Sequence, residues 1–162
     1  MDSFDIPYFY NEEKVDKEQL KGFKYKIIKS LEEIKNIKVI RLLFSSKNSD
    51  YLLNIKNEIG NIKNLQGQIT YFMSGKNIIE INSFGVCKGE ALRWLCNYLN
   101  VDLKETIAIG DDYNDESMLK MAGVGCCVKS AHEDIKKVSK YICEKDYFEG
   151  SVKEVIDKFI LS

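Results

Sequence analysis

The chain has 162 residues, with 24 lysines and arginines against 25 aspartates and glutamates, and a net charge of -1. This length allows one ordinary hydrophobic core or two small ones, and the balanced charge argues against nucleic acid or an anionic membrane as a partner. No apolar run is long enough to span a membrane and the N-terminus is acidic, unlike a signal peptide, so we expect a cytoplasmic protein.

The first half of the chain predicts a small α+β unit. A serine cap at Ser30 precedes a helical pattern, a strand rich in branched residues follows, and a second helix ends at Gly60. Two further strands are joined at Ser74-Gly75, which is a hairpin signal. These elements cover residues 30–36, 37–46, 49–60 and 67–83.

The second half alternates short apolar strands with helices, a pattern that predicts a parallel sheet with right-handed crossovers. The expected strands are 106–110, 124–128 and 140–144, and the expected helices are 88–100, 116–123, 132–140 and 150–161. The first of these helices has apolar residues spaced for a buried face: Leu92, Leu95, Cys96 and Leu99, with Trp94 as a further core residue.

The five cysteines do not predict a disulfide or a zinc site, because their number is odd and no C-x-x-C pair occurs. Cys126 and Cys127 are adjacent in an apolar stretch. On a strand they would face opposite ways, and we expect both to be small buried hydrophobic residues.

An acidic cluster follows the strand at 106–110: Asp111, Asp112, Asn114 and Asp115 fall within five positions. In open parallel sheets, ligands bind beyond the carboxyl ends of the strands. Oxygen ligands clustered there suit Mg²⁺, which takes one or two carboxylates and completes its shell with water and phosphate. Capping of the next helix is the alternative for any one of these acidic residues. An EF-hand is excluded, because Ser117 stands where that loop needs glycine.

Three segments carry a family resemblance. GDDYNDESML (110–119) resembles the fourth motif of the haloacid dehalogenase-like phosphatases, and INSFGVCKGEALRWL (81–95) resembles the stretch with their third motif, a lysine followed by glycine. Residues 128–156 resemble the family's closing segment. The nearest subgroup is the Cof-type, in which an inserted α/β cap precedes these segments.

The resemblance implies an α/β fold: a partial Rossmann-like parallel sheet with a small α+β cap that selects the substrate. The change of pattern falls near residues 83–86. We therefore expect the cap at 1–83 and the C-terminal part of the haloacid dehalogenase-like core at 84–162.

The resemblance also implies the activity, a Mg²⁺-dependent phosphatase acting on a small phosphorylated metabolite, and assigns roles. Asp111 would bind Mg²⁺ directly, and Asn114 and Asp115 would be further metal ligands or would orient the metal. Lys88 would hold the phosphate oxygens, so Lys88, Asp111 and Asp115 are the expected catalytic residues. Asp112 is a weaker candidate, because its position varies in the family.

Two other polar residues near these motifs, His132 and Ser130, are not assigned a role in the site. The lone His132 lies in a polar helical pattern and is predicted to face solvent. Ser130 stands where relatives usually have asparagine, which puts a phosphate contact there in doubt.

The motif that carries the family's nucleophile, D-x-D-G-T, does not occur in this sequence. Asp2 and Asp5 have the wrong spacing, and RLLFSS, with Ser45 or Ser46, fits the second motif but lies inside the expected cap. We therefore expect a phosphatase fragment that is inactive alone. The alternative is a non-catalytic family member that binds a phosphorylated ligand or a protein partner. A doubly wound receiver domain is a more distant alternative, because it too gathers aspartates at strand ends. It is disfavoured, because it would need acidic residues after its first strand and no inserted cap.

The strand at 106–110 would lie beside the nucleophile strand in the family. Without that neighbour it would present an unpaired edge, which is a template for pairing with another chain. We expect self-association through the second half, unless a segment such as residues 4–10 closes the sheet.

Overall fold

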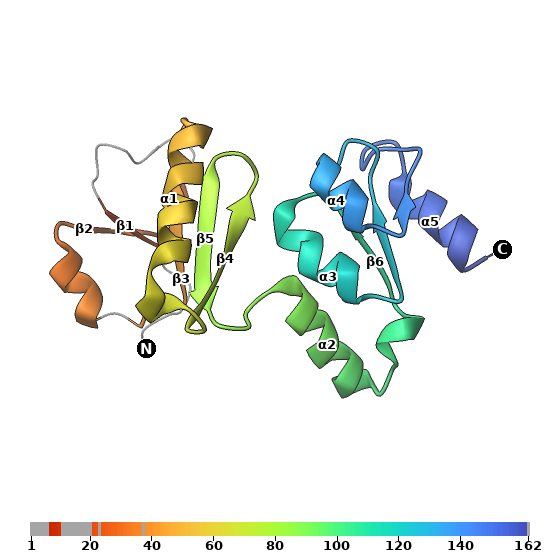
Figure 1. The fold of residues 1–162 in the computed structure, drawn as a ribbon, viewed down its shortest axis with the longest axis horizontal. Helices are drawn as coiled ribbons and strands as arrows, with labels where there is room; N and C mark the ends of the chain where they lie inside the picture. The colour runs from red at the N-terminus through yellow and green to blue at the C-terminus, as the bar shows by residue number, and fades with distance from the viewer. Residues whose placement is uncertain (1–6, 11–20, 23, 37, 162) are drawn as a thin grey trace. The chain divides into compact units, whose positions relative to one another are not determined.

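The structure is a computed structural model that describes residues 7–10, 21–22, 24–36 and 38–161 (Figure 1). The chain divides into two compact units, Met1–Leu42 and Leu43–Ser162, and the division falls inside strand β3 (Arg41–Ser45). The assignment of residues 1–83 to a cap and 84–162 to a core stays a prediction.

The first unit contains a short parallel pair of strands, β1 (Tyr8–Tyr10) and β2 (Lys26–Ile28). The helix expected from Ser30 is a 3₁₀ helix, η2 (Leu31–Asn36), and the carboxylate of Glu33 accepts a hydrogen bond from the Ser30 N–H at 3.1 Å. Residues 8–10 of the segment considered for closing the sheet thus pair with β2; residues 4–6, like Asp2 and Asp5, lie outside the described residues.

The hairpin prediction at Ser74-Gly75 is confirmed. Strands β4 (Ile69–Ser74) and β5 (Ile78–Ser83) pair antiparallel, in a sheet of order β3-β5-β4. Gly75 has a φ of 63°, a conformation that suits glycine in a tight hairpin turn.

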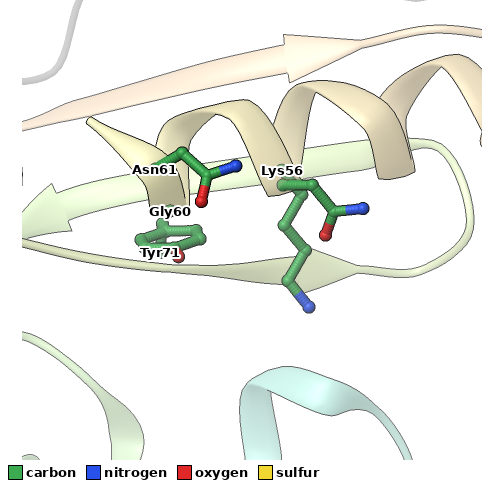
Figure 2. A pocket seen from close by; sticks show the side chains of 5 residues that line it. Lys56, Gly60, Asn61 and Tyr71 are labelled. Atoms are coloured by element: carbon green, nitrogen blue, oxygen red, sulfur yellow. The ribbon is translucent and has the colours of Figure 1, made fainter.

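Helix α1 (Ser49–Asn61) packs against this hairpin. It begins at Asn48, whose side chain accepts a hydrogen bond from the Tyr51 N–H at 3.1 Å. Near its end, Gly60 faces Tyr71 of β4 (Figure 2), and a Cβ added to Gly60 would come within 2.7 Å of the tyrosine hydroxyl. The buried contacts are made by Leu52, Ile59, Met73 and Ile79.

The parallel sheet predicted for the second half is confirmed. Its strands are β6 (Ile107–Gly110), β7 (Val124–Cys127) and β8 (Tyr141–Ile142), in the order β6-β7-β8. Helix α2 (Lys88–Leu99) and the short 3₁₀ helix η4 (Leu103–Glu105) precede β6, while η5 (Tyr113–Asp115), α3 (Glu116–Met121), α4 (Glu133–Val138) and α5 (Ser151–Phe159) lie between and after the strands. A further 3₁₀ helix, η3 (Lys63–Leu65), lies between α1 and β4. Among the residues described, no helix is both long and apolar enough to cross a membrane.

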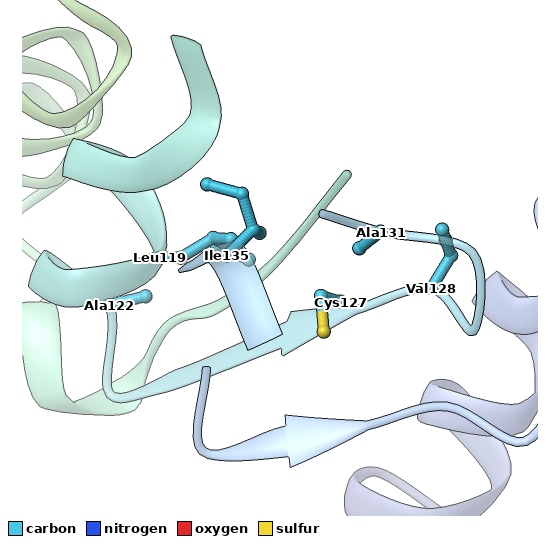
Figure 3. Packing of buried hydrophobic residues seen from close by; sticks show 7 residues of the cluster. Leu119, Ala122, Cys127, Val128, Ala131 and Ile135 are labelled. Carbon is cyan, nitrogen blue, oxygen red and sulfur yellow. The ribbon is translucent and has the colours of Figure 1, made fainter. Parts of the chain in front are cut away.

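The side chains of the two adjacent cysteines of β7 lie on opposite faces of this sheet. Cys127 packs with residues of α3 and α4 on one face (Figure 3), and Cys126 packs with Cys143 and Val155 of α5 on the other. Both are fully buried, as predicted. Burial raises the pKa of the Cys126 thiol to about 11, so it stays protonated near neutral pH.

The prediction for the buried face of α2 is partly wrong. Cys96 is buried and Leu92 is partly buried, but Leu95 and Leu99 are exposed. Trp94, predicted to lie in the core, is 66% exposed and stacks on Tyr98 with ring centroids 5.4 Å apart. Helical spacing shows which residues share a face, and burial needs in addition an element that covers that face.

Strand β6 has an open edge: among the described strands it pairs only with β7. The carbonyl groups of Thr106 and Gly110 accept hydrogen bonds from β7 and from the residue just after it. Backbone groups alternate in direction along a strand, so the N–H and C=O groups of Ile107 and Ile109 point away from β7.

We propose that the chain self-associates through this edge. In the monomer, the amide hydrogens of Ile107 and Ile109 should exchange rapidly and that of Ala108 slowly, since of these three residues Ala108 is the one whose backbone N–H faces β7. Raising the protein concentration should increase the mass seen by light scattering and protect Ile107 and Ile109. A monomer at high concentration with both amides already protected would contradict this proposal.

Candidate active site

The position of Lys88 depends on the glycine that follows it. A Cβ added to Gly89 would lie 2.7 Å from the carbonyl oxygen of Ser117, so the first turn of α2 approaches α3 more closely than a larger residue permits. The Gly89 N–H donates to the Ser117 hydroxyl at 3.0 Å. This contact places the first residue of α2 beside the turn that follows β6.

A second close approach positions Asp115. A Cβ on Gly110, the last residue of β6, would lie 2.5 Å from the Cβ of Asp115. The Asp115 side chain folds back under the turn, and its Oδ2 accepts hydrogen bonds from the N–H groups of Asp111 at 3.0 Å and Asp112 at 3.3 Å. The buried carboxylate therefore holds together the segment that carries the acidic cluster.

Lys88 supplies the positive charge that this carboxylate needs. Its Nζ donates to Oδ1 of Asp115 and to Oδ1 of Asn114, the latter at 3.3 Å. The lysine side chain is 49% exposed and that of Asp115 only 5%. Lys88 thus neutralises a buried charge on one side while the other side stays open to a ligand.

Asp111 differs from Asp115, because it is the most exposed residue of the cluster and its carboxylate accepts no hydrogen bond from the described residues. Partial burial raises the pKa of Asp111, and the negative charges of Asp115 and Asp112 raise it further, while Lys88 and His132 act in the opposite direction. A bound cation would relieve this concentration of negative charge.

The predicted metal ligands fit Mg²⁺ unequally. Both oxygens of Asp115 are occupied, and Oδ1 of Asn114 accepts from Lys88, so Asp111 is the member of the set that is free to bind a metal. Across the described residues, no group of three or more histidine, cysteine, aspartate or glutamate side chains could hold a metal ion. Mg²⁺ usually keeps water and phosphate oxygens as ligands, so Asp111 fits a cation that is completed by such groups.

The structure therefore brings together Lys88, Asn114 and Asp115, with Asp111 on the same turn; their catalytic and metal-binding roles stay predictions. Ser130 is not available for a phosphate contact, because its N–H and its hydroxyl both donate to Asp146, the N–H at 2.9 Å.

Two neighbours of this site were not anticipated from the sequence. The prediction that His132 faces solvent is wrong: the residue is half-buried, and its ring stacks on Tyr113 with centroids 4.8 Å apart. Its Nε2 lies 3.7 Å from Oδ1 of Asp112. Asp112 in turn contacts the β4–β5 hairpin through the Gly75 N–H. No periodicity in the sequence signals contacts between such distant residues.

An open cavity of about 370 Å³ lies at the C-terminal end of α1, against β4 (Figure 2). Its lining includes none of the acidic cluster and not Lys88. The residues are Lys56, Asn57, Gly60, Asn61 and Tyr71.

Comparison with known proteins identifies the family. The model of the haloacid dehalogenase-like hydrolases matches residues 3–156, nearly the whole chain. The chain belongs to this family. Lys88 and the cluster at 111–115 thus lie in a haloacid dehalogenase-like hydrolase fold.

Several relatives are phosphatases. A phosphoglycolate phosphatase from Methanobrevibacter smithii is 45% identical over 76 residues, which are 47% of this chain and 32% of that protein. The structure of a haloacid dehalogenase-like hydrolase from B. subtilis superposes with a TM-score of 0.75 at 26% identity, over 89% of this chain and 50% of the other. A subclass IIB sugar phosphatase shares the fold, with a TM-score of 0.72 at 20% identity over 90% of this chain and 55% of that one. The chain thus spans about half the length of these two structures.

In this haloacid dehalogenase-like chain, Lys88→Ala should lower the free energy of unfolding by about 1–3 kcal/mol, because it removes one hydrogen-bond partner from a buried carboxylate. The measurement is urea denaturation followed by circular dichroism. Lys120→Ala is the matched control: Lys120 pairs with Glu116, but the two side chains are 56% and 42% exposed, so the change should stay within about 0.5 kcal/mol. Equal effects of the two substitutions would show that Asp115 does not depend on Lys88.

Asp111 should make stability depend on pH. Its pKa in the folded chain lies above the ordinary value of 3.8, so the folded state binds more protons and stability falls as pH rises through that window. Asp111→Asn should therefore raise the melting temperature at pH 7, and this gain should disappear below about pH 4. Asp146→Asn is the mirror control: hydrogen bonds from Ser130 hold the pKa of Asp146 below its usual value, so that variant should be less stable at pH 7. A destabilised Asp111→Asn protein at pH 7 would contradict this prediction.

Proposed function

We propose that this chain is part of a Mg²⁺-dependent phosphatase that hydrolyses phosphate monoesters of small metabolites. The observation that carries the proposal is the arrangement of Lys88, Asp115 and Asp111: a half-exposed cation, a buried carboxylate that fixes it, and a free carboxylate on the same turn. The phosphatases among the relatives support the reaction class.

Each residue has a separate task in this proposal. Lys88 binds phosphate oxygens with the N–H that faces solvent, and it offsets the charge between the phosphate and an attacking carboxylate. Asp115 and Asn114 orient the lysine, since both accept hydrogen bonds from its Nζ. Asp111 holds the metal. When bound, Mg²⁺ supplies further positive charge next to the phosphate.

The nucleophile of the proposed reaction does not come from the described part of this chain. In the family it is an aspartate of a D-x-D motif, and no D-x-D occurs in these residues. In this proposal, residues 1–162 alone bind metal and phosphate weakly and lack the carboxylate that would form the covalent intermediate.

The test begins with the 162-residue chain alone. It should release no phosphate from 2-phosphoglycolate or from sugar phosphates in the presence of Mg²⁺, and calorimetry should show weak Mg²⁺ binding. Addition of an N-terminal segment carrying D-x-D-G-T should produce turnover that Asp111→Ala or Lys88→Ala abolishes and that Lys120→Ala leaves intact. Turnover by the chain alone, or low-micromolar Mg²⁺ affinity, would show that the site is complete within these residues.

The second function that we propose is a non-catalytic member of the family that binds a phosphorylated ligand or a protein partner. It predicts phosphate binding that depends on Lys88 but no turnover with any N-terminal segment. The sequence encoded just upstream of Met1 separates the two proposals, because an in-frame D-x-D-G-T favours the enzyme.

A further inference from the structure

Asp112 stands next to the proposed metal ligand but makes its contacts elsewhere. Its Oδ1 accepts from the Tyr113 N–H at 2.7 Å and so caps the short helix η5. Its Oδ2 accepts from the N–H of Gly75, 37 residues earlier, at 2.5 Å. One carboxylate thus joins the turn after β6 to the tip of the β4–β5 hairpin.

No described residue of the hairpin accepts a hydrogen bond from this N–H. The last pair of the ladder is Ser74 with Ile78, and Gly75 lies in the turn beyond it. Within the part of the chain that the structure describes, Asp112 is the acceptor of the Gly75 N–H. The Gly75 residue is half-buried, and its N–H has this one acceptor among the described residues, so the hydrogen bond to Asp112 favours the position of the hairpin tip beside the turn.

Two neighbouring residues contact the same hairpin. The Nδ2 of Asn114 lies 3.5 Å from the hydroxyl of Ser74, a weak hydrogen bond. The ring of Tyr113 packs against the buried cluster between α1 and the hairpin, and also against the cluster beneath α3 and α4. Residues 112, 113 and 114 therefore all contact the hairpin. Asn114 belongs to the proposed site as well, because its Oδ1 accepts from Lys88, whereas Asp111 and Asp115 make no hydrogen bond to the hairpin among the described residues.

We propose that residues 112–114 are a docking point for the hairpin tip and that Asp112 is the positioning residue that fixes it. While the bond from Gly75 is made, the hairpin is held beside the turn that carries Asp111. When it breaks, only the Tyr113 packing and the weak contact of Asn114 remain. This proposal does not rest on the proposed phosphatase function.

The decisive variant is Asp112→Asn in the full 162-residue chain. The amide oxygen can still accept from the Tyr113 N–H and keep the cap, but an NH₂ group then faces the Gly75 N–H and cannot accept its proton. We expect protection of the Gly75 amide against hydrogen exchange to fall about tenfold or more. Its proton resonance should move upfield, while the paired amides of the β4–β5 ladder stay protected.

Asp102→Asn is the matched control. Asp102 caps the 3₁₀ helix η4 with the same reciprocal pattern, accepting from the Lys104 N–H at 2.9 Å, and no hydrogen bond joins it to the hairpin. This substitution should leave the exchange rate and the resonance of Gly75 unchanged.

Unchanged protection and an unchanged resonance of Gly75 in a folded Asp112→Asn protein would overturn the proposal, since the hairpin would then be held by Tyr113 alone or not docked. If that variant does not fold, Asp112→Ser gives the same readout, because serine can cap η5 but is too short to reach Gly75. Asp112→Glu, which retains a carboxylate, should keep more of the protection than either variant. Equal loss in all three variants would still support Asp112, because it would show that the bond needs the length of the aspartate side chain as well as its charge.

Discussion

The buried carboxylate of Asp115 is the interaction on which the site depends. It takes two backbone N–H groups from the turn after β6 and the charge of Lys88 from the start of α2. A carboxylate removed from water is tolerated only when such partners compensate its charge. The backbone of the acidic turn and the direction of the lysine are therefore set by one group that is not itself open to a ligand.

This arrangement divides the acidic cluster into separate tasks. The buried member organises the turn, the exposed member, Asp111, keeps its oxygens free, and Asp112 contacts the hairpin. Four oxygen-bearing side chains in five positions thus do not form a single metal cage. Their closeness in sequence reflects a tight turn whose successive side chains point to different neighbours.

The sequence predicted the parallel sheet of the second half, the hairpin and the position of α2, because each has a strong local signal: apolar strands between helices, a glycine turn, or a lysine-glycine pair at a helix start. It did not predict which apolar residues of α2 are covered, since Trp94 and Cys96 lie on the same short helix and differ only in what packs against them. The bond between Asp112 and Gly75 was missed for a related reason. It joins residues 37 positions apart, and no spacing rule connects them.

Gly89 and Gly110 limit how the sequence of this site can diverge. Neither carries a functional group, yet each stands where one added carbon would meet Ser117 or Asp115. A homologous protein could keep every lysine, aspartate and asparagine of the cluster and still lose the geometry of the site if one of these two glycines were replaced. A comparison of the polar residues alone would not detect this loss. Whether the two glycines are retained is therefore the better sign that the site is intact.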